Sequence, residues 1–409
     1  MDTGSAPRTE PSADGTALDE PLDVAVVGAG QSGLACGYFL RRWAQDVERG
    51  RSPGPAPRFA LFDASSEPGG SWPRHWPSLR LFSPAEHSSL PGRRMPGSGE
   101  DNPDAAHVVD YLADYESRYD LPVRRGVRVA SVSRQDGRFA LRDDDGRLLA
   151  LSRTVVSATG SFTRPFVPAL PGTADFTGRQ RHSSAYTGPQ GYAGRRVLVV
   201  GGGNSGAQIA ADLHGSAAAV TWATQRPPRF MPDDVDGRVL FRLASARVLD
   251  RRTEQVGTPG EDLGDIVAVP PVRAARDAGA MDAVPAPSRL TAHGAAWDTD
   301  AGRRHGWPSG AGAPAAAAVR GTEQRFDDVL WCTGFRPELR HLRGLLQEPT
   351  RSGRPRMHEH LRTASADVDG LYLLGYGDWC GPASATLTGV GLFARATVAD
   401  IEARLRDDH

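Results

Sequence analysis

Two glycine-rich turns about 170 residues apart constrain the fold of this chain more than any other feature. The first, Gly28-Ala-Gly-Gln-Ser-Gly33, follows the apolar residues 24–27, and the second, Gly201-Gly-Gly-Asn-Ser-Gly206, follows the apolar residues 197–200. In this spacing the first glycine shapes the turn, the second lets the backbone approach a pyrophosphate, and the third packs the next helix on the strand. Helices expected at 34–40 and 207–213 direct their positive ends towards those phosphates. One such motif is a weak signal, but two predict an α/β chain with two Rossmann-like units, each binding a dinucleotide.

Length and charge narrow the class of protein. The chain has 409 residues, 39% of them hydrophobic, which is enough for two or three domains with separate cores. Its 48 basic and 49 acidic residues are mixed throughout, which argues against nucleic acid or an anionic membrane as the main partner. Residues 1–20 are polar, and no segment has the apolar run of a signal peptide or a membrane span. We therefore expect a disordered tail on a cytoplasmic protein.

The cysteines exclude one redox mechanism. Cys36, Cys332 and Cys380 are far apart, so the chain lacks the Cys-x-x-Cys or Cys-x4-Cys dithiol that flavin disulfide reductases use. The triplet His358-Glu-His360 has no third ligand at a useful spacing, which indicates a solvated loop and no metal site.

The first unit continues with a strand at 59–62 that ends in Asp63, an acid placed to accept hydrogen bonds from a ribose. The interval from Gly33 to Asp63 is 30 residues, against about 20 in most such units. A charged, Pro/Gly-rich surface loop at 41–57 explains the excess. A simple strand-end turn is the alternative role for Asp63.

The stretch 67–91 is dense in Gly, Pro, Trp and Arg, which excludes a regular helix. Its two tryptophans, Trp72 and Trp76, indicate either a loop packed on a flat ring such as an isoalloxazine or a hydrophobic plug against the sheet. The composition of the loop does not decide between these two hypotheses. The elements expected next are a helix at 105–119 and strands at 127–132, 139–141, 148–151 and 154–160.

The second unit lacks an acid at the position that Asp63 occupies in the first. Its second strand, 219–224, is followed by Gln225 and Arg226. An acid there would bind the ribose of NADH, whereas Arg226 with Thr224 suits a 2′-phosphate, so NADPH is favoured; a solvated arginine is the alternative. The elements expected after it are a helix at 272–280, a surface loop at 310–319, strands at 326–331 and 371–374, and a closing helix at 383–404.

The segment between the units carries the most specific motif. Phe176-x-Gly178-x-x-x-His182-x-x-x-Tyr186 matches the fingerprint of the class B flavin-dependent monooxygenases at every fixed position. The chain therefore resembles the flavoproteins with two dinucleotide-binding domains. Further matches are Gly-Gly-Ser-Trp at 69–72, the Thr-Gly strand ends at 159–160 and 333–334, and Gly-Asp at 377–378. The stretches 78–84, 232–237 and 377–385 are most similar to bacterial flavin monooxygenases associated with arsenic-resistance operons.

This resemblance implies a domain plan in which the second Rossmann-like domain is inserted in the first. The expected parts are a tail at 1–20, FAD-binding segments at 21–165 and 331–409, a linker with the fingerprint at 166–190, and an NADPH-binding domain at 191–330.

The resemblance also implies site residues. The candidate catalytic residues are Ser83, His182 and Tyr186, and for the last two a chemical role and a hinge role are equally open. Family members usually carry an Asn where this chain has Phe82 and Ser83, so Ser83 either donates the hydrogen bond in its place or has an N-cap or turn role next to Pro84. The residues implied to contact FAD or NADPH are Gly28, Gly30, Gln31, Ser32, Gly33, Asp63, Gly70, Trp72, Arg80, Phe82, Arg128, Thr159, Gly160, Gly201, Gly203, Asn204, Ser205, Gly206, Thr224, Arg226, Thr333, Gly334, Gly377 and Asp378.

The implied activity begins with reduction of FAD by NADPH, assisted by the positive end of the closing helix. Oxygen then adds to give a C4a-hydroperoxyflavin, which transfers one oxygen atom to a small soft nucleophile with a nitrogen, sulfur or arsenic centre. The implied partners are this substrate and O2, with the protein a monomer or homodimer. An NADPH-dependent flavin reductase that passes electrons to a quinone or a protein is the alternative, favoured by Phe82. A redox sensor or scaffold that binds both nucleotides without turnover is the third hypothesis.

Overall fold

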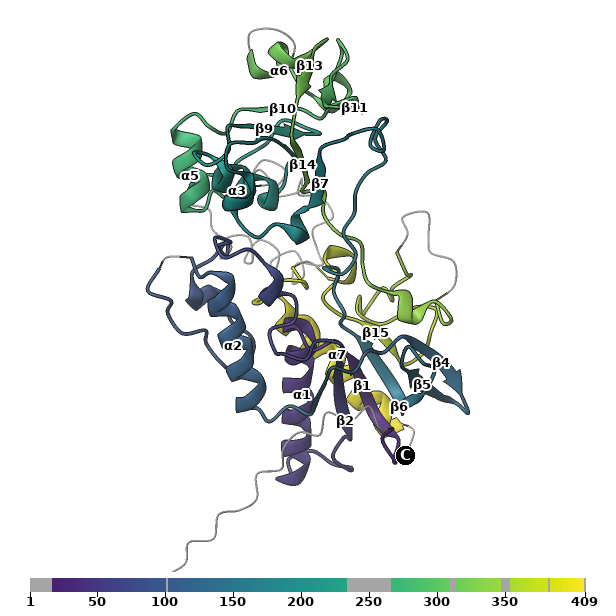
Figure 1. The fold of residues 1–409 in the computed structure, drawn as a ribbon. Coiled ribbons are helices and arrows are strands. Elements are labelled where there is room, and N and C mark those ends of the chain that lie inside the picture. Colours follow the sequence, from purple (N-terminus) through teal and green to yellow (C-terminus); the bar gives the residue numbers. More distant parts are fainter. Residues whose placement is uncertain are drawn as a thin grey trace, which may run out of the picture.

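The computed structural model describes residues 17–100, 102–233, 266–308, 314–346, 354–381 and 383–407. The chain forms two sheet-containing bodies, with β1, β2 and β6 in the lower one and β9, β10 and β14 in the upper one (Figure 1). It passes from the lower body to the upper and back, as an inserted second unit requires. Among the described residues, no helix combines the length and apolarity needed to cross a membrane.

The first sheet has strand order β3-β2-β1-β6-β5-β4, with β15 also paired to β6. The pairs among β3, β2, β1, β6 and β15 are parallel, and β5 and β4 are added antiparallel. The strands are β1 (Leu22–Val27), β2 (Phe59–Asp63), β3 (Val123–Arg125), β4 (Ser131–Gln135), β5 (Arg138–Arg142), β6 (Leu148–Ser157) and β15 (Leu371–Leu373).

Strand β1 is buried on both faces, as its run of apolar residues predicts. Val24 and Val26 pack in the cluster that contains the helices, while Ala25 and Val27 pack in the cluster on the other face. The α/β fold class predicted from the sequence is confirmed.

Strand β6 corrects the expected strands at 148–151 and 154–160. They form one strand, because no turn-forming residue separates them and its two halves pair with different neighbours. Phe139–Arg142 of β5 pairs antiparallel with its first half, and β1 pairs parallel with its second half. The strand expected at 127–132 begins only at Ser131, although Val127 and Val129 are buried.

Three helices cover this sheet: α1 (Gln31–Glu48), α2 (Ala105–Arg118) and α7 (Val390–Asp407). The expected loop at 41–57 is wrong over 41–48, because Trp43 and Ala44 continue the buried face of Leu40 and the charged residues between them are good helix formers. The closing helix begins at Val390 and not at 383. Gly381 and Gly389 interrupt the preceding segment, in which Thr386 accepts a hydrogen bond from the Gly389 N–H.

The second sheet is parallel, with strand order β10-β9-β8-β14-β7. Its strands are β7 (Arg179–His182), β8 (Arg196–Val200), β9 (Ala219–Thr224), β10 (Ala283–Pro285) and β14 (Asp328–Trp331). Strand β7 lies inside the segment expected as a linker, and it is an edge strand of this sheet. The buried Asp328 holds it there through ion pairs with Arg179 and Arg195.

Helices α3 (Asn204–Leu213) and α5 (Pro270–Asp277) pack on the second sheet, and a small sheet of β11 (Arg289–Thr291), β12 (Gly294–Ala296) and β13 (Glu323–Arg325) adjoins it. The surface loop expected at 310–319 is wrong over α6 (Pro314–Val319). This alanine-rich run is helical, with Ala316 and Val319 buried, because alanine has the highest helix propensity.

A loop of the first unit is anchored in the second. Trp76 packs in the core of the second unit, with its ring centroid 5.8 Å from that of Tyr186. The Gln208 side chain of α3 accepts a hydrogen bond from the Arg80 N–H and donates one to the Arg80 carbonyl, both at 3.1 Å. Trp76 is therefore a hydrophobic plug, as one of the two hypotheses for this loop states, but it packs in the core of the second unit and not against the first sheet.

Candidate active site

In the first turn, Gly28 and Gly33 are required by the fold itself. Gly28 has φ +104°, and a Cβ there would lie 2.5 Å from the Ala158 carbonyl oxygen. A Cβ on Gly33 would lie 1.8 Å from the Gly28 carbonyl oxygen, whereas a Cβ on Gly30 would meet only the Gly70 Cα at 3.7 Å. The Gly30 backbone therefore lines the cavity at the N-terminus of α1 without a close clash, opposite Gly70, which is suited to a pyrophosphate.

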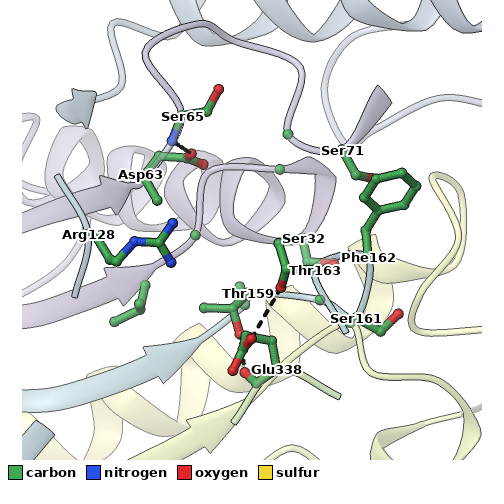
Figure 2. Close-up of a pocket in the computed structure, with 18 of the residues that line it drawn as sticks. Ser32, Asp63, Ser65, Ser71, Arg128, Thr159, Ser161, Phe162, Thr163 and Glu338 are labelled. Carbon is green, nitrogen blue, oxygen red and sulfur yellow. Dashed lines mark hydrogen bonds between the residues drawn. The ribbon is translucent and has the colours of Figure 1, made fainter. Parts of the chain in front are cut away.

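A cavity of about 850 Å³ adjoins this turn, within the range of roughly 300–1,000 Å³ typical of ligand sites. Asp63 and Arg128 line one side of it in Figure 2, and Ser71 and Phe162 line the other. The expected cofactor contacts that line it are Gly28, Gly30, Gln31, Ser32, Asp63, Gly70, Trp72, Arg128, Thr159 and Gly160. A cavity of this volume, with a glycine backbone at a helix N-terminus in its wall, fits FAD.

Asp63, at the end of β2, is fixed at one edge of the cavity. Its buried carboxylate accepts a hydrogen bond from the Ala29 N–H at 2.6 Å. It accepts another from the Ser65 N–H at 2.8 Å (Figure 2). Arg125 lies 3.6 Å from the same carboxylate. At this end an exposed ion pair joins Arg128 and Asp144, with 3.5 Å between their charged atoms.

Gln31 connects three segments around the cavity. Its side-chain oxygen accepts a hydrogen bond from the Trp72 indole at 3.0 Å, and its amide donates to the Ala385 carbonyl. The N-terminus of α1, the Gly-rich loop and the C-terminal segment are thereby held together at the cavity wall. The sequence indicated Gln31 as a cofactor contact but not this bridging role.

A buried hydrogen-bond network fixes the carboxyl end of β6. Ser157 Oγ lies 3.0 Å from His341 Nε2 and 2.6 Å from the Tyr376 hydroxyl, which is also 2.7 Å from Thr159 Oγ1. Burial lowers the pKa of His341 to about 4 and raises the pKa of Tyr376 to about 12, so both are neutral at pH 7. Sequence reasoning missed this network, because its partners are 184 and 219 residues apart.

His182 and Tyr186, the fingerprint residues, do not line the cavity. His182 Nδ1 accepts from the Ser184 N–H at 3.1 Å, so Nε2 carries the proton and donates to the Gly334 carbonyl at 2.9 Å. Burial lowers the pKa of His182 and raises that of Tyr186, whose hydroxyl donates to Asp212 at 2.7 Å. His182 therefore links β7 to the segment that follows β14, and Tyr186 is hydrogen-bonded to α3, so neither side chain is directed at the cavity.

Arg80, Phe82 and Ser83 also lie outside the cavity lining. Arg80 is paired with Glu100 at 3.1 Å and is 3.8 Å from Asp104. Phe82 is 39% exposed, and Ser83 is buried.

Near the C-terminal segment, the structure places neighbours of the expected residues at the cavity. Phe335, Gly375 and Ala385 line it, whereas Thr333, Gly334, Gly377 and Asp378 do not. Thr333 and Gly334 instead bind the segment that leads into the second unit, through hydrogen bonds to Phe166 and His182.

The second turn repeats the geometry of the first. A Cβ on Gly201 or Gly206 would lie 2.2 Å from a carbonyl oxygen, whereas a Cβ on Gly203 would meet open space. Asn204 opens α3 and accepts a hydrogen bond from the Val267 N–H, and Ser205 follows it. This turn fits a second dinucleotide, as the equivalent turn fits the first.

At the end of β9, the two residues expected to contact a 2′-phosphate differ in exposure to solvent. Arg226 is exposed, but Thr224 is fully buried, and its hydroxyl donates to the Arg226 carbonyl at 2.6 Å. The threonine hydroxyl therefore shapes the turn that presents the arginine.

Comparisons with known proteins identify relatives over part of the chain and over nearly all of it. Residues 69–243 match the pyridine nucleotide-disulphide oxidoreductase family. An uncharacterised CzcO-like oxidoreductase of Geobacillus kaustophilus is 33% identical over 54% of this chain and 59% of its own length. An indole-3-pyruvate monooxygenase of Oryza sativa is 31% identical over 54% of this chain and 52% of its own length. The chain thus spans between half and three fifths of these two curated relatives.

The solved structures extend the likeness to the whole fold. A flavin-containing monooxygenase from Stenotrophomonas maltophilia is 42% identical with a TM-score of 0.77, and the alignment covers 94% of this chain and 99% of that one. A bacillithiol disulfide reductase from Staphylococcus aureus, 14% identical with a TM-score of 0.64, shares the fold alone. The three cysteines here are free, buried and not arranged as a dithiol. The chain belongs to the flavin-containing monooxygenase family.

Proposed function

We propose that this protein is an NADPH-dependent FAD monooxygenase that inserts one oxygen atom from O2 into a small soft nucleophile. The observation that carries the proposal is the pair of equivalent glycine turns, one opening on the cavity of about 850 Å³, in a chain that aligns over 99% of a solved flavin-containing monooxygenase. Bound FAD would supply the chemistry, taking a hydride from NADPH and reacting with O2 to a C4a-hydroperoxyflavin.

The residues of this chain would bind and shield that flavin. The open backbone at Gly30 and the N-terminus of α1 would bind the pyrophosphate, and Asp63 would lie at the adenosine end. The bridge from Trp72 through Gln31 to Ala385 closes the cavity wall and would exclude water from the reacting ring.

NADPH is the proposed reductant. Arg226 is exposed beyond β9, next to the second turn, and no acid follows that strand to bind a free ribose hydroxyl. We expect Arg226→Ala to raise the KM for NADPH by about 10- to 100-fold and to leave the KM for NADH nearly unchanged. Steady-state kinetics with both nucleotides measure this, and equal effects on the two would refute the 2′-phosphate assignment.

Substrate and setting are proposed at the level of chemical class. The substrate is a small molecule with a nitrogen, sulfur or arsenic centre, and one curated relative is named for indole-3-pyruvate. The balanced charge argues against nucleic acid or a membrane surface as the main partner. The proposed setting is the cytoplasm, with the protein a monomer or homodimer.

A flavin reductase that passes electrons to a quinone or a protein is the second candidate. The resemblance suggests it, because Phe82 and Ser83 replace the Asn implied for the family, although Phe82 lies outside the cavity lining. Turnover of a thioether under ¹⁸O2 separates the two functions. A sulfoxide that carries one ¹⁸O atom supports the monooxygenase. NADPH consumption with electrons recovered in an added quinone, and no labelled product, supports the reductase.

A further inference from the structure

One arginine on the cavity wall has no carboxylate partner among the described residues. Arg74 is exposed, and its guanidinium lies over the Phe162 ring at 4.9 Å from the centroid. The other arginines that line the cavity are matched: Arg128 is paired with Asp144, and Arg340 donates to Glu338. Arg74 is therefore the unneutralised arginine of the described wall.

The wall around Arg74 is aromatic. The Phe162 ring stacks on Phe335 with centroids 5.3 Å apart, and the His75 ring meets the Phe162 edge at 4.8 Å. The ring centroids of Trp72 and His75 are 5.3 Å apart. Burial, and secondarily the charge of Arg74, lowers the pKa of His75 to about 4, so this imidazole is neutral at pH 7. An apolar molecule would contact these rings and meet a single positive charge.

The phosphates of the nucleotides have other binding elements. The first glycine turn faces the cavity from the N-terminus of α1, and the second turn and Arg226 are not part of the cavity lining. Arg74 belongs to the separate loop that follows Gly70. A guanidinium presents a planar set of N–H donors that matches a carboxylate.

We propose that Arg74 binds the carboxylate of the substrate, so the substrate is a small organic acid whose apolar body packs on Phe162, His75 and Trp72. This inference rests on the proposed function, because it specifies the molecule that the flavin would oxygenate. It also makes Arg74 the residue that determines selectivity for an anionic over a neutral substrate.

The test compares (phenylthio)acetate with its neutral counterpart (phenylthio)acetamide on the FAD-loaded enzyme. We expect Arg74→Gln to lower kcat/KM for sulfoxide formation from the acid by about 10- to 100-fold, with a much smaller loss for the amide. Arg74→Lys should fall between, since it keeps the charge but not the planar donor set. Arg94→Gln, which changes an exposed arginine outside the cavity lining, is the matched control.

Binding without turnover separates this inference from the proposed function. Titration of the oxidised enzyme with (phenylthio)acetate, followed by the flavin absorbance change, should show a Kd raised by the same factor in Arg74→Gln. That result supports the anion site even if no sulfoxide forms, in which case only the oxygen transfer is refuted. Equal losses for acid and amide would overturn the inference. So would a raised KM for NADPH without discrimination between them, since it would assign Arg74 to a nucleotide phosphate.

Discussion

At the scale of single residues, the three glycines of the first turn have separable roles. Gly28 and Gly33 lie against carbonyl oxygens of the fold, so a side chain at either position displaces backbone. Gly30 has an ordinary φ of −77°, and a Cβ there would make one ordinary contact, 3.7 Å from the Gly70 Cα. The folded chain itself therefore does not require a glycine at this position, which is consistent with the pyrophosphate contact proposed for Gly30.

We expect Gly30→Val to fold but to purify without bound FAD, because the valine side chain would occupy the space proposed for the pyrophosphate. Flavin absorbance per mole of protein measures the loss, and circular dichroism checks the fold. Gly33→Ala is the matched control and should be destabilised, because its Cβ would lie 1.8 Å from an oxygen. A Gly30→Val protein with full flavin content would contradict the placement.

His341 makes stability depend on pH in a defined window. Its pKa is about 4 in the folded protein, lowered by burial, against about 6.5 in an unfolded chain. Between these values the unfolded chain binds a proton that the folded one does not, so stability falls as pH drops from about 6.5 to 4, by up to about 3 kcal/mol. Above this window the contribution is fully present.

We expect His341→Gln to reduce the dependence of the free energy of unfolding on pH. Some dependence should remain in this variant, because the pKa of His75 is also lowered to about 4. Urea unfolding of both proteins at pH 7 and pH 4.5 measures it. Identical slopes in parent and variant would show that His341 is not the titrating group.

At the scale of elements, strands and helices were predictable where hydrophobic periodicity is strong. Strand β1, helix α2 and strand β9 lie close to their expected bounds. The C-terminal end of α1 was not predictable, because the second half of the helix is charged and has no apolar run. Trp43 is recognised as a core residue only once α1 is packed against the rest of the first unit. The join of the two halves of β6 depends on pairing with β5 and β1, which no local pattern records.

Helix α3 connects the two units through one amide. Gln208 is buried and satisfies both backbone groups of Arg80. We expect Gln208→Leu to lower the free energy of unfolding by about 1–3 kcal/mol for each group left without a partner. Gln208→Glu keeps the acceptor but buries a carboxylate whose second oxygen faces the Arg80 carbonyl, so it should also be destabilising. Chemical denaturation of the three proteins measures this, and an unchanged midpoint in Gln208→Leu would show that the contact adds nothing.

At the scale of the whole molecule, the two ends of the described chain complete one body around the candidate site. Strand β15 pairs with β6, and α7 packs with α1 in one core. The paired glycine turns made this two-unit plan predictable from sequence, and the fingerprint indicated the family. The aromatic wall with Arg74 was not predictable, because it joins the loop at 72–75 to Phe162 and Phe335, which become neighbours only when the units are assembled.

The central claim is that NADPH reduces a flavin bound in this cavity and that the reduced flavin passes oxygen to a substrate. The most direct measurement is stopped-flow spectroscopy, in which the enzyme is reduced by NADPH without oxygen and then mixed with oxygenated buffer. We predict rapid bleaching of the flavin, followed by a transient oxygen adduct with its own absorbance band before oxidised flavin returns. Direct return to oxidised flavin with stoichiometric hydrogen peroxide, with and without an organic acid substrate, would contradict the account.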